Sequence, residues 1–232
     1  MSAHVRITDV SPRDGLQNEP GVIAASEKAR LVELLCRTGV DEVEVTSFVS
    51  PRWVPQLGDG AEVFEALAAR FPRGTRRPMF SALVPNERGL DGALAANHAA
   101  GRALIEKVSL FTAASETFSR KNTNASIAET FDRFTPVLDR AAVAGLRVRL
   151  YVSCVVACPF EGPISPDAVA AVARRGLQVM RRAHDSRPAG APGLAGIEID
   201  LGDTIGAATP ETISPVIERT LEMGRASCRE RV

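Results

Sequence analysis

The sequence predicts an α/β fold, a (β/α)8 TIM barrel that is incomplete here, with about six βα units. Short β-branched runs alternate six times with longer amphipathic segments that carry helix-capping signals at their ends. The chain holds no G-x-G-x-x-G and no G-x-x-x-x-G-K-[ST] string, which favours a barrel over an open nucleotide-binding sheet. Polar residues able to do chemistry follow several predicted strands, the end at which barrels carry their active sites.

The six strands are predicted over residues 4–10, 40–45, 79–84, 104–110, 147–154 and 197–201. Helices are predicted over residues 26–38, 87–100, 126–144, 165–183 and 209–223. The run from Ser126 to Glu129 fits a capping box, and Ser165-Pro166 fits an N-cap followed by a first-turn proline. Residues 46–55 form a long βα connection, and such loops often carry function.

Composition limits the class of partner. Of the 232 residues, 45% are hydrophobic and 24% are charged, which are globular values. Lysine plus arginine equals aspartate plus glutamate at 28 each, so charge gives no argument for nucleic acid or a membrane surface, and a small-molecule ligand is expected. No apolar run has the length of a membrane span, and no signal peptide is recognisable at the N-terminus, so we expect a cytoplasmic protein.

The four cysteines are too few and too scattered for a disulfide framework, and we expect reduced thiols. They are Cys36, Cys154, Cys158 and Cys228. Cys154 and Cys158 lack a nearby second cysteine or histidine pair that would complete a zinc site. We therefore interpret them as small residues at the end of a strand.

The most informative segment is Ser11–Glu19, which follows the first predicted strand. Arg13 offers a cation for an oxyanion, and Asp14 offers a hard oxygen ligand for a metal ion. Taken singly, Asp14-Gly15 is an ordinary turn dipeptide, Glu44 fits an exposed strand residue, and Asp203 fits a loop residue. The full nine-residue string makes chemistry the better interpretation.

Five strings, in this order, resemble the hydroxymethylglutaryl-CoA lyase family, which belongs to a superfamily of metal-dependent lyases and synthases with TIM barrels. They are residues 11–19 (SPRDGLQNE), 46–56 (TSFVSPRWVPQ), 113–116 (AASE), 151–154 (YVSC) and 201–206 (LGDTIG). The likeness covers roughly residues 4–224. One such string is weak evidence, whereas five in order are specific.

The resemblance implies an enzyme that cleaves 3-hydroxy-3-methylglutaryl-CoA to acetoacetate and acetyl-CoA by a metal-assisted retro-Claisen reaction in leucine degradation. Asp14 would bind a divalent metal cation, Mg²⁺ or Mn²⁺, and Arg13 would stabilise the developing enolate. Glu44 would support both groups, and Asp203 would relay protons. The acyl-CoA substrate would contact Gln17, Ser47, Tyr151 and Thr204.

Some family features are absent from the sequence. The family carries a His-x-His pair on a seventh strand and then a glycine-rich loop with a reactive cysteine. The histidines present are His4, His98 and His184, and none is expected to bind metal. We expect residues 1–224 to be a partial barrel domain and residues 225–232 to be a tail unlike the family, the product of a frame change or a gene-fragment end.

A sheet that lacks about two of eight strands cannot close, and its unpaired edge strands invite association. We therefore keep a homo-oligomer as one alternative. We expect little lyase turnover from this chain alone. Two alternatives stay open as well. One is a related synthase, or a lyase acting on another 3-hydroxyacyl-CoA, although residues 46–56 argue against a synthase. The other is an inactive barrel fragment or pseudo-enzyme.

Overall fold

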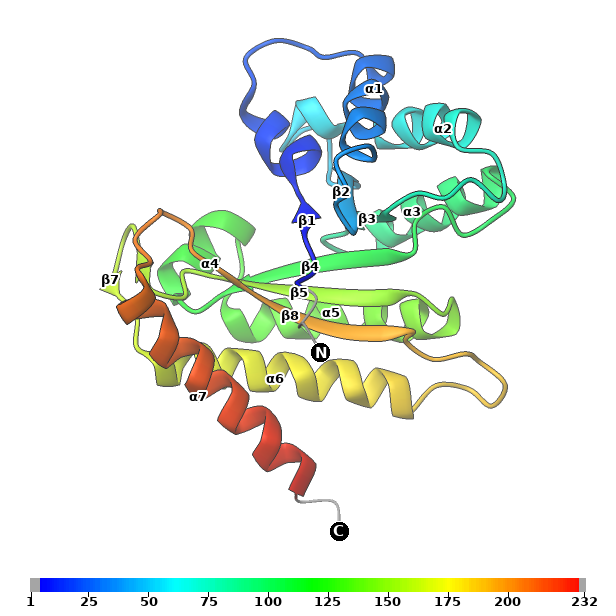
Figure 1. The fold of residues 1–232 in the computed structure, drawn as a ribbon. Helices are drawn as coiled ribbons and strands as arrows, with labels where there is room; N and C mark the ends of the chain where they lie inside the picture. Colours follow the sequence, from blue (N-terminus) through cyan, green and yellow to red (C-terminus); the bar gives the residue numbers. More distant parts are fainter. Residues whose placement is uncertain (1–4, 230–232) are drawn as a thin grey trace. The chain divides into compact units, whose positions relative to one another are not determined.

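A computed structural model describes residues 5–229, with side chains described through residue 222 (Figure 1). The chain divides into two compact units, Met1–Ser109 and Leu110–Val232. The boundary falls inside strand β4 (Lys107–Ala113), so each unit is described by itself.

In the first unit, β1 (Thr8–Asp9), β2 (Glu42–Ser47), β3 (Met79–Leu83) and the first residues of β4 are hydrogen-bonded in that order, all in parallel. Helices α1 (Ala25–Leu35), α2 (Gly60–Arg70) and α3 (Glu87–Ala99) pack as successive neighbours (Figure 1). The β–α alternation of this unit is that of a parallel barrel sheet.

In the second unit, the rest of β4, then β5 (Arg147–Ser153) and β8 (Gly196–Gly202) are hydrogen-bonded in that order. Its helices are α4 (Glu116–Thr123), α5 (Ile127–Val143), α6 (Pro166–Asp185) and α7 (Pro210–Arg229). Helix α6 packs between α5 and α7 (Figure 1). The two-residue strands β6 (Ala157–Cys158) and β7 (Gly162–Pro163) pair separately and in antiparallel fashion.

Each sheet segment has one apolar face and one polar face. In β5 the buried residues Val148, Leu150 and Val152 alternate with Arg149 and Tyr151. Leu150 packs against Gly176 of α6, so the apolar face of β5 points toward the helices. The polar residues therefore lie on the opposite face, which in a barrel is the interior.

The first unit repeats this division through its register. Glu44 pairs with Ser81, Ser81 pairs with Lys107, and Leu83 pairs with Ser109. Paired residues of neighbouring strands point to the same side, so Glu44, Ser81, Lys107 and Ser109 share one face. Strand register thus gathers these polar side chains, the candidate Glu44 among them, on one face.

The predicted α/β architecture, an incomplete barrel of alternating strands and helices, is confirmed. The capping box at Ser126 is present, because its hydroxyl accepts from the Glu129 amide while the Glu129 carboxylate accepts from the Ser126 amide. The Ser165 cap is also present, with its hydroxyl accepting from the Ala168 amide. These local signals were sufficient to locate two helix starts.

Several predicted boundaries were wrong. The first strand is reduced to Thr8–Asp9, because the chain turns into a π-helical segment, η1 (Ser11–Gly15), that contains Pro12. Residues 104–105 do not start β4, because the Asn97 side chain accepts hydrogen bonds from both of their amides. Helices α2 and α4 were not predicted.

Within residues 5–229, no helix combines the length and the apolar character needed to cross a membrane.

Candidate active site

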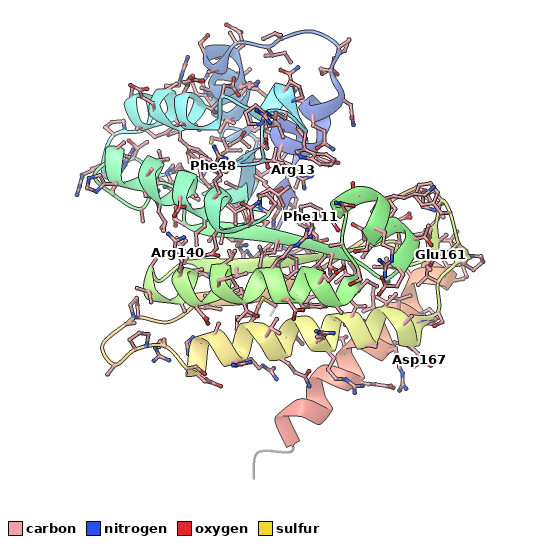
Figure 2. The ribbon with its side chains drawn as sticks, turned by 180° about the vertical axis from the view of Figure 1, so that it is seen from behind. Arg13, Phe48, Phe111, Arg140, Glu161 and Asp167 are labelled. Atoms are coloured by element: carbon pink, nitrogen blue, oxygen red, sulfur yellow. The ribbon has the colours of Figure 1, made fainter. Side chains whose placement is uncertain are left out.

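The turn that follows β1 places Arg13 and Asp14 side by side. Both of their amides donate to the carbonyl of Val10, at 3.1 and 2.7 Å, which closes the first turn of η1. A 3₁₀ turn, η2 (Leu16–Asn18), continues the chain and carries Gln17. Figure 2 shows Arg13 beside these helical turns.

The guanidinium of Arg13 is held from two directions. Its Nε donates to Glu44 Oε1 at 2.5 Å, and its Nη1 donates to Asp14 Oδ1 at 2.6 Å. The Glu44 side chain is fully buried, the Arg13 side chain is 12% exposed, and the Asp14 side chain is 55% exposed. Charge-assisted hydrogen bonds to two carboxylates fix the guanidinium plane while leaving part of Arg13 accessible.

Glu44 is therefore not an exposed strand residue. Its Oε2 accepts a hydrogen bond from Ser109 Oγ at 2.6 Å, so both carboxylate oxygens have partners inside the unit. A buried carboxylate needs such partners because burial without them is strongly unfavourable. The position predicted to support the arginine does contact it.

Gln17 joins the same group, because its Nε2 donates to Asp14 Oδ1 at 3.1 Å. We refer to Arg13, Asp14, Gln17 and Glu44 as the Arg13 cluster. Ser47 lies at the end of β2 with its hydroxyl buried and without a hydrogen-bond partner among the described residues. Its substrate-binding role stays a prediction.

The described residues of the first unit do not make a complete metal centre. Asp14 supplies one carboxylate, while both oxygens of Glu44 already accept from Arg13 and Ser109. Across the side chains that the structure describes, no group of three histidine, cysteine, aspartate or glutamate residues is arranged to hold an ion. Asp14 can contribute one hard oxygen ligand, whereas a divalent cation requires several.

In the second unit, Asp203 holds the loop that follows β8. Its two carboxylate oxygens accept from the amides of Ala207 and Ala208, at 3.0 and 2.7 Å. Hydrogen bonding, led by the Ala208 amide, lowers the pKa of Asp203 below its ordinary value against the opposing effect of burial. Asp203 is thus an ionised acceptor at neutral pH, and its predicted proton-relay role stays a prediction.

Thr204 and Tyr151 have separate partners in the second unit. Thr204 Oγ1 accepts from the amide of Cys154 at 2.8 Å, which joins the loop after β8 to the end of β5. Tyr151 accepts at its hydroxyl from Arg149 Nη1 at 3.2 Å, and the buried Arg149 also pairs with Glu198. Their predicted contacts with substrate remain predictions.

The thiols at the end of β5 are buried. Burial raises the pKa of Cys154 to about 11, and this residue has a positive φ of 61°. Cys158 Sγ lies 3.1 Å from Ser115 Oγ. Among the cysteines whose side chains are described, Cys36, Cys154 and Cys158 are not joined in a disulfide, and their reduced state stays a prediction. Cys228 lies outside the residues whose side chains are described.

Sequence reasoning missed Ser109 and Arg149 as partners of predicted site residues. Both lie on the polar face of a strand whose opposite face is apolar. A polar residue at every second position of an otherwise apolar strand was the available signal, because it marks a polar barrel interior. The pairing partner could not be inferred without the register.

Comparison with known proteins decides the family. Residues 4–225 match the family described as HMGL-like. The chain belongs to the HMGL-like family. It is similar to the hydroxymethylglutaryl-CoA lyase of Pseudomonas mevalonii, with 43% identity over 214 residues, 92% of this chain and 62% of that protein.

Solved structures agree with this family. The HMG-CoA lyase from Brucella melitensis matches with a TM-score of 0.80 and 37% identity, over 96% of this chain and 69% of that one. An HMG-CoA lyase from Acenitobacter baumannii, solved in complex with coenzyme A and 3-methylmalate, matches with a TM-score of 0.78 and 28% identity, over 96% and 65%. The chain spans about 60% of the length of the curated relatives it matches.

Proposed function

We propose that the protein is a carbon–carbon lyase that cleaves 3-hydroxy-3-methylglutaryl-CoA to acetoacetate and acetyl-CoA. The observation that carries the proposal is the Arg13 cluster, a guanidinium held by two carboxylates directly after the first strand, in a member of the HMGL-like family. The names of the relatives support the substrate, and the coenzyme A complex of the Acenitobacter baumannii lyase supports an acyl-CoA ligand.

The proposed reaction sets two requirements. The tertiary hydroxyl loses its proton, the C2–C3 bond breaks, and its electron pair moves onto the thioester carbonyl as the acetyl-CoA enolate. Protonation at C2 then gives acetyl-CoA, and the other fragment leaves as acetoacetate. The site must therefore supply a positive group for the enolate oxygen and a proton acceptor for the hydroxyl.

Arg13 meets the first requirement. Its charge is permanent, and Glu44 and Asp14 hold its plane before substrate arrives, so little reorganisation is needed as negative charge develops. An interaction that strengthens as the enolate forms accelerates the chemical step rather than merely tightening substrate binding. For the second requirement, Asp203 is an ionised carboxylate in the second unit and is the proposed proton relay.

The proposal includes Mg²⁺ or Mn²⁺ with Asp14 as one oxygen ligand, because Asp14 is the exposed carboxylate of the cluster. The described residues do not complete that site, so we expect the 232-residue chain to bind Mn²⁺ only weakly, with a Kd on the order of 1 mM or above. Titration with Mn²⁺, followed by electron paramagnetic resonance, measures this Kd. Asp14→Ala should weaken binding further, and binding unaffected by that change would remove Asp14 from the proposal.

The activity test requires a polypeptide as long as the relatives, of whose length this chain spans about 60%. We suggest fusing residues 1–224 to the segment of the Pseudomonas mevalonii lyase that lies beyond the match, and we call this fusion the completed chain. With Mg²⁺ or Mn²⁺, it should release acetoacetate and acetyl-CoA in equal amounts from 3-hydroxy-3-methylglutaryl-CoA. The unfused chain should show little turnover. A folded completed chain that releases neither product would contradict the proposal.

The alternatives are separated in the same assay. A lyase for another 3-hydroxyacyl-CoA would cleave a homologue with a longer branch faster than the methyl compound. A synthase would instead consume acetyl-CoA and a 2-oxo acid and release free CoA. The names of the matched relatives favour the lyase of the methyl compound.

A further inference from the structure

One buried hydroxyl in the first unit has a partner that the proposed chemistry depends on. Ser109 lies on β4 and is fully buried, and its Oγ donates to Glu44 Oε2 at 2.6 Å. Glu44 lies on β2 and is also fully buried. The other oxygen of the same carboxylate accepts from Arg13 Nε at 2.5 Å.

The hydrogen bond from Ser109 on β4 to Glu44 on β2 spans the intervening strand β3. Glu44 pairs with Ser81 on β3, and Ser109 pairs with Leu83 on the same strand. Ser81 and Leu83 are two residues apart and point to the same side, so Ser109 reaches Glu44 across the polar face of the sheet. The rigid sheet, rather than a flexible loop, therefore sets the position of the Ser109 hydroxyl.

The geometry restricts the rotation of the carboxylate. A glutamate carboxylate can turn about its last side-chain bond, because that torsion is broad. A second, charge-assisted hydrogen bond to the other oxygen limits this rotation. The direction in which Glu44 presents Oε1 then fixes where the Arg13 guanidinium lies.

We propose that Ser109 is a positioning residue, which holds Glu44 so that the Arg13 guanidinium is kept at one orientation. Its importance for turnover rests on the proposed lyase function, but the positioning itself is a property of the folded chain. Ser109 does not touch the substrate in this proposal and acts through Glu44.

The direct test is hydrogen exchange of the Arg13 Nε–H, observed by ¹⁵N NMR in the 232-residue chain and assigned by the loss of its signal in Arg13→Lys. Ser109→Ala should speed this exchange about 10- to 100-fold, the change that loss of one hydrogen bond to a charged group produces. Ser109→Thr keeps the hydroxyl and should restore slow exchange.

Ser81→Ala is the matched control. Ser81 is equally buried, lies on the neighbouring strand β3, and its hydroxyl has no hydrogen-bond partner among the described residues. This variant removes the same atom from the same face, beside Glu44, without removing a hydrogen bond to that carboxylate. We expect its Arg13 Nε–H exchange to match that of the unmodified chain.

If Ser109→Ala does not fold, Ser109→Cys keeps the side-chain shape but donates only weakly, and it should also speed exchange. Unchanged exchange in Ser109→Ala or in Ser109→Cys, or an equal increase in Ser81→Ala, would overturn the proposal.

Kinetics of the completed chain give a second readout. Ser109→Ala should lower kcat about 10-fold with little change in KM, because Arg13 is expected to act on charge that develops during the reaction. Ser109→Thr should recover most of kcat, and Ser81→Ala should leave it unchanged. If the completed chain is inactive, the proposed function fails while the exchange result still decides the positioning. If it is active and exchange is unchanged, the positioning proposal alone fails.

Discussion

The two units hold their candidate carboxylates in different ways. In the first unit, Glu44 contacts Arg13 and Ser109, which are 31 and 65 residues away along the chain. In the second unit, Asp203 contacts the amides of Ala207 and Ala208, only four and five residues away. The first arrangement depends on strand register and the second on a single loop, so the two should respond differently to substitution.

The first unit also buries an ion pair on the same face of the sheet as Glu44. Lys107 Nζ lies 2.5 Å from Glu42 Oε2, and both side chains are fully buried. Charges in such a place are tolerated because they compensate one another, and removing one partner leaves the other in an unfavourable environment. We expect the non-local ionic arrangement to be the more sensitive of the two.

The largest expected effect on stability follows from this pair. Lys107→Met should lower the free energy of unfolding by about 3–5 kcal/mol, because the buried Glu42 carboxylate loses the ammonium 2.5 Å away, while the half-exposed Arg6, 3.7 Å from the same oxygen, compensates its charge less well. Urea denaturation followed by circular dichroism measures the change. The double variant Glu42→Gln with Lys107→Met removes both charges and should recover part of the loss. A single variant within about 1 kcal/mol of the parent chain would show that the pair is not a determinant.

A smaller effect is expected at the loop of the second unit. Thr204→Val keeps the side-chain shape but removes the oxygen that accepts from the Cys154 amide. The free energy of unfolding should fall by about 1–2 kcal/mol, because a backbone donor loses its partner. The same denaturation experiment measures it. A loss as large as that of Lys107→Met would erase the distinction between the two units.

The smallest effect concerns Asp203 and depends on pH. Because hydrogen bonding lowers the pKa of Asp203 in the folded state, its contribution is present above the unfolded pKa, near 4, and is lost as pH falls through the folded value. Asp203→Asn should lower the melting temperature at pH 7 by about 2–4 °C. The difference between the two proteins should shrink toward pH 3. A difference that is constant with pH would argue against this role.

Local features of the fold were predictable from the sequence, and contacts set by register were not. The cap at Ser126 follows from a glutamate three residues later and the cap at Ser165 from the adjacent proline, and the structure contains both. The start of β4 could not be located from the sequence. The amides of Leu104 and Ile105, which were assigned to the strand, donate to the side chain of Asn97, seven and eight residues earlier. Its effect is tertiary and leaves no mark on strand propensity.

The candidate site follows the same division. Arg13 and Asp14 were predicted from one short string, and the structure brings Glu44 and Gln17 to them. Ser109 was missed because its partner lies two strands away, and only the pairing of β2 with β3 and of β3 with β4 brings the two together. In the second unit, Tyr151, Asp203 and Thr204 were predicted as site residues, and their roles stay predictions.

The central claim is that Arg13 stabilises the charge that develops during cleavage, and kcat of the completed chain tests it most directly. Arg13→Lys keeps the charge but loses the fork that contacts both Glu44 and Asp14, and it should lower kcat by about 10²–10³-fold. Arg37→Lys, on an exposed arginine paired with Glu33, is the control and should leave kcat unchanged. If Arg13→Lys turns over at the rate of the parent, the account is contradicted.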